Sequence, residues 1–134
     1  MSQQSHASAR AEPACRTIEF DDAEVIRVGR DYFLIVRGTK PCANMRVSLT
    51  PLVYIQCPEY WGIEVIGCVP NGICIEATAP YVEAMWLTGV IGSRGIEVIG
   101  ANKTEQFDVP GGCSTGIPQQ ALSQGERVQP KKKG

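Results

Sequence analysis

Short apolar or alternating segments, separated by glycine, proline and asparagine, run through the middle of this chain. Residues 24–28 (EVIRV) and 32–37 (YFLIVR) are one such pair, and Gly29, Arg30 and Asp31 lie between them. A glycine followed by polar residues predicts a hairpin turn. The second segment is apolar on both faces of its alternation, which predicts a central strand.

Residues 45–57 alternate between apolar and polar side chains over an unusual length. One face of this segment would carry Val47, Leu49, Val53, Ile55 and Cys57. A period of two over such a length predicts a strand and excludes a helix. Pro51 cannot donate a ladder hydrogen bond, so two strands, or an edge strand with a bulge, are expected here.

Further strands are expected at residues 63–69, 73–78, 81–87, 96–99 and 105–109, with glycine or proline at most of the joints. The chain would then hold about seven to nine strands spaced roughly eight to twelve residues apart, a pattern typical of sandwiches and barrels. The predicted fold is therefore all-β. It is an antiparallel β-sandwich, immunoglobulin-like or jelly-roll-like, or a small barrel.

A length of 134 residues suits a single domain, and the composition at both ends differs from that of the middle. Residues 1–15 are expected to be a flexible N-terminal segment, and 16–109 a single β-domain. Residues 110–134 would form a flexible tail, rich in proline and glycine and basic at its end. The expected domain carries 8 basic and 12 acidic residues, a net charge of −4. The net charge of −1 for the whole chain excludes nucleic-acid binding by bulk charge.

The sequence shows no secretory signal and no apolar run long enough to span a membrane. A cytoplasmic location without a membrane partner is therefore expected. In a reducing compartment the six cysteines would be free and mostly buried thiols. The sharpest alternative is a disulfide between Cys68 and Cys74, which flank a turn at residues 70–72.

Catalytic and metal-binding patterns are sparse. The only histidine, His6, lies in the polar N-terminal stretch, which argues against a serine or cysteine triad. There is no Cys-x-x-Cys pair and no phosphate-binding loop. We therefore expect no catalytic residue, no metal and no cofactor.

Two features suggest a binding surface. Tyr60 and Trp61 follow Glu59 in an expected loop, where exposed rings would suit a sugar or a protein partner. In addition, the hexapeptide GIEVIG occurs at residues 62–67 and again at 95–100. Two equivalent strands, in symmetric places on two sheets, would explain the repeat.

Alternation places one face of each repeat toward the core and mixes charge with aliphatic groups on the other. That second face would hold Glu64, Ile66, Glu97 and Ile99, with Arg94 at the preceding turn. An apolar patch of this kind often marks a contact surface.

The sequence thus favours a non-catalytic binding or self-assembly module, expected to form a homo-oligomer or to bind a protein or carbohydrate. One alternative is a small enzyme without histidine that uses carboxylates or a thiol. Another is a thiol- or metal-responsive protein.

Overall fold

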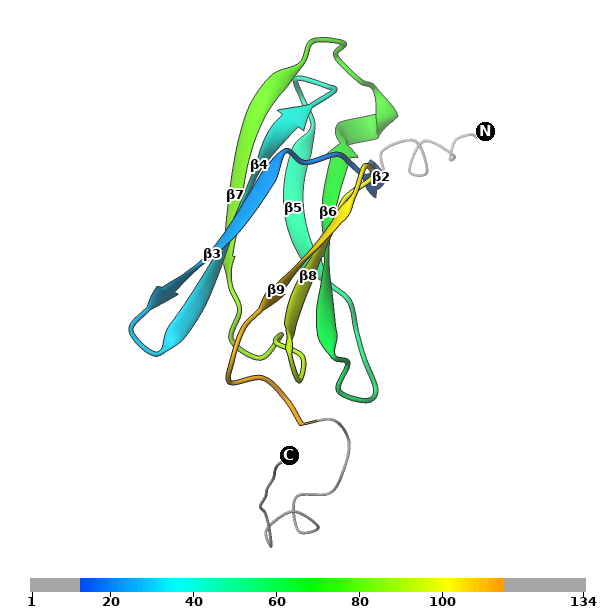
Figure 1. Ribbon diagram of the computed structural model, residues 1–134. Helices are drawn as coiled ribbons and strands as arrows, with labels where there is room; N and C mark the ends of the chain where they lie inside the picture. Colours follow the sequence, from blue (N-terminus) through cyan, green and yellow to red (C-terminus); the bar gives the residue numbers. More distant parts are fainter. Residues whose placement is uncertain (1–12, 115–134) are drawn as a thin grey trace, which may run out of the picture.

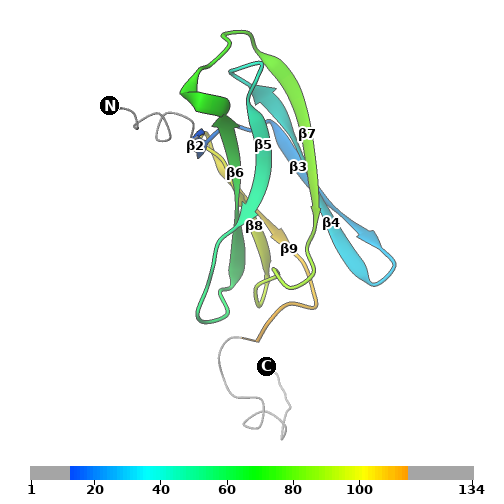
Figure 2. The ribbon, with the colours of Figure 1, turned by 180° about the vertical axis from the view of Figure 1, so that it is seen from behind.

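The computed structural model describes residues 13–114, which form eight β-strands and one turn of 3-10 helix (Figures 1 and 2). The elements are β2 (Ala14–Thr17), β3 (Asp22–Val28), β4 (Asp31–Lys40), β5 (Arg46–Pro51), β6 (Tyr60–Val69), η1 (Pro70–Gly72), β7 (Ala79–Trp86), β8 (Gly95–Ile99) and β9 (Thr104–Asp108). They build two sheets around one core, so the predicted all-β class is confirmed. His6, most of the expected N-terminal segment and the basic end of the chain lie outside the described residues.

The smaller sheet has three strands in the order β3–β4–β7. Its hairpin turns through Gly29 and Arg30, with Val28 opposite Asp31. Gly29 has a φ of 65°, a conformation that glycine adopts without a steric penalty at the first turn residue. The structure thus confirms both the predicted hairpin and the central place of β4.

The larger sheet has five strands and is centred on β6. One edge of β6 pairs with β5, and the other pairs first with β8 and then with β2. β9 pairs with the far edge of β8. Every pairing between described strands is antiparallel except that of β6 with β8, which is parallel.

The two hexapeptides are neighbours in this one sheet, and the expectation of symmetric places on two sheets is wrong. Their register is offset by two residues, so Gly62 lies opposite Glu97 and Ile63 opposite Val98. An offset of two keeps the same side chains on the same face. Ile63, Val65, Ile96 and Val98 are accordingly all buried, as the alternation predicts.

The core lies between the two sheets and is mainly aliphatic. Its largest fully buried side chains include Phe20, Leu34, Met45, Leu87 and Ile96. Burial of each such side chain stabilises the fold by about 1.5–3 kcal/mol relative to exposure. Leu34 comes from β4 and Ile96 from β8, so central strands of both sheets contribute to this core.

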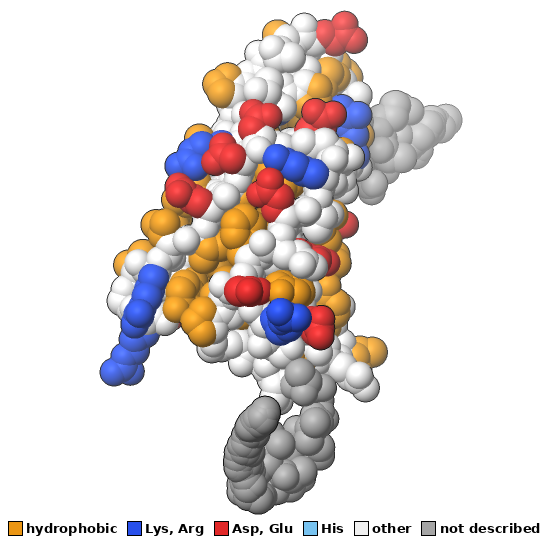
Figure 3. Space-filling model, in the orientation of Figure 1, with side chains coloured by type: hydrophobic (Ala, Val, Ile, Leu, Met, Phe, Trp, Pro, Cys, Tyr) orange, Lys and Arg blue, Asp and Glu red, His pale blue; other side chains and the backbone are white. Residues whose placement is uncertain are grey.

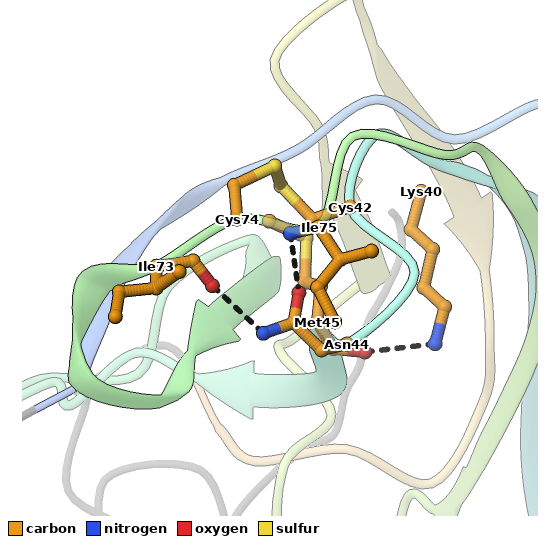
Figure 4. Close-up of a disulfide and its surroundings, with 7 residues drawn as sticks. All are labelled: Lys40, Cys42, Asn44, Met45, Ile73, Cys74 and Ile75. Carbon is orange, nitrogen blue, oxygen red and sulfur yellow. Dashed lines mark hydrogen bonds between the residues drawn. A yellow bond between two sulfur atoms is a disulfide. The ribbon is translucent and has the colours of Figure 1, made fainter.

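The strand expected at residues 73–78 is absent, because a side chain binds this segment in place of a neighbouring strand. Asn44 donates a hydrogen bond from Nδ2 to the carbonyl of Ile73, and its Oδ1 accepts one from the amide of Ile75 (Figure 4). A disulfide holds Cys74, between them, to Cys42. Ile73 and Ile75 remain exposed on either side of it.

Residues 52–59 are a loop, and the alternating strand expected through residue 57 ends at Pro51. Trp61 Nε1 donates to the carbonyl of Leu52, and the Tyr54 hydroxyl accepts from the amide of Gly62. The expected shared face of Val47, Leu49, Val53 and Ile55 is therefore wrong beyond Pro51, where the inward phase reverses. Leu52 and Tyr54 contact β6, whereas Val53 and Ile55 are 95% and 101% exposed.

All six cysteines are paired, and the expectation of free thiols is wrong. The disulfides join Cys15 to Cys68, Cys42 to Cys74 and Cys57 to Cys113. Cys68 and Cys74 are both oxidised, but not to each other. Cys68 faces Cys15 because β2, a strand that the sequence did not indicate, pairs with the end of β6. Cys113 lies in the expected tail, yet it is bonded to the loop before β6.

Candidate binding surfaces

Four of the residues around the start of β6 and β8 form a small polar cluster. The Tyr60 hydroxyl donates a 2.6 Å hydrogen bond to the Asp108 carboxylate. The Arg94 guanidinium lies 5.5 Å from the centre of the Tyr60 ring, within cation–π range. The Arg94 amide donates to the Glu59 carbonyl. The hydrogen bond to Asp108 favours the protonated phenol and raises the pKa of Tyr60.

Trp61 does not share a surface with Tyr60. The two residues open β6, and successive side chains of a strand point to opposite faces. Trp61 is half-buried and packs against the core, with its ring edge-on to Tyr54 at a centroid distance of 5.1 Å. The aromatic pair expected in a loop is therefore divided between the outer face and the core.

The mixed face of the repeat lies on the outside of the larger sheet. Glu64, Ile66, Glu97 and Ile99 are all half-buried. Glu97 accepts a hydrogen bond from Gln106 Nε2, and Glu64 lies opposite Ile99 across the β6–β8 pair. Neither isoleucine belongs to the strongly exposed apolar residues. This face is therefore a polar surface with partly covered aliphatic groups.

A larger apolar surface covers the outside of the smaller sheet, and the sequence analysis missed it. Cross-strand pairing puts Ile26, Phe33 and Trp86 in one row across all three strands. The rings of Phe33 and Trp86 contact each other with centroids 4.8 Å apart. Ile26 is 39% exposed and Trp86 is 50% exposed.

The same face continues in two further rows. Glu24, Ile35 and Ala84 form the second row, and Asp22, Arg37 and Val82 form the third. We call the six uncharged side chains of these three rows the apolar face: Ile26, Phe33, Ile35, Val82, Ala84 and Trp86.

The charges at the edge of the apolar face neutralise one another in part. Arg37 Nη1 lies 3.2 Å from the Asp22 carboxylate, and Nη2 lies 3.1 Å from that of Glu24. The hydrogen bond that Arg37 donates to Glu24 is the main reason that the pKa of Arg37 is raised. Because all three side chains are well exposed, these pairs add little to stability. The result is an apolar centre bordered by one paired ionic corner.

One signal in the sequence points to this surface. Residues 33–36 are apolar at every position, which is expected for a strand covered on both sides. The structure covers only the side with Leu34 and Val36. On the other side, Phe33 and Ile35 are half-buried by neighbours on the same sheet, and no second layer of the described chain packs over them.

No side chains of residues 13–114 come together as a metal centre, because no three histidine, cysteine or acidic side chains cluster there. The one helical element in this range is the three-residue turn η1, and no helix in it is long and apolar enough to cross a membrane. Comparison with known proteins finds no matching family model, no matching curated protein and no matching solved structure.

Proposed function

We propose that this chain is a non-catalytic binding module that associates with a second copy of itself through the apolar face. The observation that carries the proposal is the row of Ile26, Phe33 and Trp86, which spans the whole sheet and exposes Ile26 and Trp86 on either side of the half-buried Phe33. An exposed aromatic and aliphatic patch bordered by polar groups is the usual anatomy of a contact site. Trp is also the residue type most enriched among energetically dominant interface positions.

A second copy suits this face for an electrostatic reason. The predicted domain has a net charge of −4, so two copies repel each other over most of their surfaces. On the apolar face, Arg37 already balances part of the charge of Asp22 and Glu24. Two such faces can therefore meet with their apolar centres together and their ionic corners at the rim. Face-to-face packing of two sheets is a common arrangement, and a two-fold axis makes it self-complementary.

The size of the face sets the strength of the contact. β3 has seven residues, and three strands at ordinary spacings cover roughly 23 Å by 14 Å, or about 320 Å². A stable interface buries about 800 Å² per partner. We therefore expect a weak, concentration-dependent dimer, with a Kd of roughly 10 μM to 1 mM.

The disulfides support an oxidising compartment as the place of action, instead of the cytoplasm expected from the sequence. Three disulfides in a small domain persist where thiols are not kept reduced. They also leave no free cysteine for a thiol- or metal-responsive role.

Sedimentation equilibrium of the oxidised chain between micromolar and millimolar concentrations tests the dimer. The unmodified chain should dimerise over this range, and Trp86→Ser should remain a monomer. Ile55→Ser is the matched control, because Ile55 is fully exposed but lies on a loop outside the apolar face. A chain that stays monomeric at millimolar concentration would refute the proposal. Equal dimerisation of Trp86→Ser would refute it as well.

A further inference from the structure

The two sheets have different widths, and this leaves one strand position empty. Because β2 and β8 lie one after the other along the same edge of β6, the larger sheet is four positions wide. The smaller sheet is three strands wide. On one side of the sandwich β5 contacts β7, whereas on the other side β3 and β9 make no comparable contact. In the described chain, no strand of the smaller sheet therefore covers β9.

This open side, between β3 and β9, is lined by apolar groups. Figure 3 shows hydrophobic side chains gathered in a band between these two strands. Ala23 and Val25 from β3 and Phe107 from β9 are partly buried and pack against the core. They are the inward-facing residues of two edge strands. In the described chain, no further strand packs against them from the open side.

One end of the open side is closed by a side chain from the β8–β9 turn. At the closed end, the Asn102 side chain makes two hydrogen bonds to the backbone of Phe20, where the chain crosses between the sheets. A separate hollow of about 300 Å³ lies between the β3–β4 turn and the segments that follow β7 and β9, and is lined by Tyr32, Ile91 and Pro110 among others.

The free edge of β3 also presents unpaired backbone groups. The carbonyl of Tyr32 accepts a hydrogen bond from Leu87 on the β7 side of β4. Since antiparallel residues alternate in direction, Phe33 and Ile35 direct their backbone groups toward β3 instead. Their partners there are Ile26 and Glu24.

By the same alternation, Ala23, Val25 and Arg27 direct their N–H and C=O groups away from β4. No backbone bond to any of the three is found from the free-edge side among residues 13–114. β3 contains no proline, the residue that blocks pairing at many sheet edges.

We propose that the free edge of β3 binds a single extended strand of another polypeptide, which adds to the smaller sheet opposite β9. The added strand would satisfy the backbone groups of Ala23, Val25 and Arg27, and its inward side chains would cover Phe107. Its chemistry follows from the site. Inward positions require apolar side chains, and outward positions beside Asp22 and Glu24 favour neutral or basic ones.

The width of the gap selects a lone strand over a second copy of the domain. If two copies paired through their β3 edges, β9 of each copy would lie under the smaller sheet of the other. That place is already taken by β8, which lies between β6 and β9. This site is distinct from the apolar face and does not depend on the proposed dimer.

Hydrogen exchange followed by NMR on the full oxidised chain, at a concentration below dimerisation, tests the proposal. The probe is a synthetic peptide of alternating valine and threonine with a lysine at each end. The matched control peptide has the same sequence with alternate amides N-methylated, so that it cannot add as a strand. We expect the amides of Ala23, Val25 and Arg27 to exchange rapidly in the free protein. The first peptide should protect them and the second should not.

Two variants separate this site from the dimer. Val25→Pro removes one edge N–H at a position where an edge strand tolerates proline, and should weaken peptide binding about tenfold or more. Val25→Thr keeps the N–H and the shape of the side chain, and should bind nearly as well as the unmodified chain. Trp86→Ser should abolish dimerisation and leave peptide binding unchanged.

Three results would overturn the inference: no binding at millimolar peptide, binding without protection of these amides, or equal binding of the methylated peptide. Slow exchange of the three amides in the free protein would also overturn it, because another segment of the same chain would then already occupy the edge. The exchange measurement needs no variant, so it decides the question even if Val25→Pro does not fold.

Discussion

Removal of the disulfide between Cys57 and Cys113 should be the most destabilising of the three disulfide deletions. The bond spans 56 residues. The Cys42–Cys74 bond offers a route of nearly the same length between Cys57 and Cys113, so this loop stays about as long when the other disulfides are intact. The same bond shortens the route between Cys15 and Cys68 to about 33 residues, so that loop contributes less. A closed loop of this length lowers the entropy of the unfolded chain by an amount worth about 4 kcal/mol at 25 °C. The same relation gives about 0.5 kcal/mol less for the 32-residue loop of Cys42 and Cys74.

This contribution is a large part of the total stability, because the free energy of unfolding of a domain is typically about 5–15 kcal/mol. Urea unfolding of the double variant Cys57→Ala/Cys113→Ala should show a free energy of unfolding lower by about 3–4 kcal/mol. The slope with urea should rise, because the freed unfolded chain exposes more surface. Ile55→Ala in the same loop is the control and should change stability by less than about 0.5 kcal/mol. A loss below about 1 kcal/mol with an unchanged slope would refute the argument from loop entropy.

Two further predictions concern the core. Leu34→Ala deletes a fully buried side chain of the central strand β4 and should cost about 2–5 kcal/mol in urea unfolding, and a cost under 1 kcal/mol would contradict the assigned core. Burial, with smaller contributions from Asp21 and Glu83, raises the pKa of Tyr81 to about 12. The unfolded chain releases this proton near pH 10 while the folded chain retains it, so the stabilisation is complete below pH 10 and is lost as pH rises toward 12. Tyr81→Phe should flatten the fall in stability over that window, and equal pH profiles for the two proteins would disprove the assignment.

Local patterns predicted the elements whose stability is local. The β3–β4 hairpin follows from Gly29 and from alternation in its two strands, and the core positions of the repeat follow from alternation alone. In each case the deciding interaction lies within a few residues of the pattern. The strand at residues 73–78 failed for the opposite reason. Its hydrogen-bond partners are the Asn44 side chain and the Ala43 amide, about thirty residues away, and nothing near Ile73 indicates them.

The disulfide pairing and the apolar face also depend on contacts between residues far apart in the sequence, which local patterns do not indicate. A choice of Cys68 with Cys74 uses only the nearest turn, whereas the true partner of Cys68 is fixed by β2 at the start of the domain. The sequence indicates that residues 33 and 35 are buried, because a strand that is apolar on both faces normally packs against another layer on each face. Which of the two sides the second sheet covers is set by long-range packing, which residues 33–36 alone do not indicate.

The two parallel copies of the hexapeptide must take different positions in the larger sheet when the chain folds. Two identical hexapeptides carry no information about which should take the middle of the larger sheet. The flanking residues settle the choice: Tyr60 and Trp61 precede the copy in β6, and Cys68 follows it. Parallel partners thirty-five residues apart also form late, because the intervening chain must first cross to the other sheet and return. The order of strands would then depend on when the disulfide between Cys15 and Cys68 forms during folding. A catalyst of disulfide formation would therefore influence which hexapeptide takes the central position.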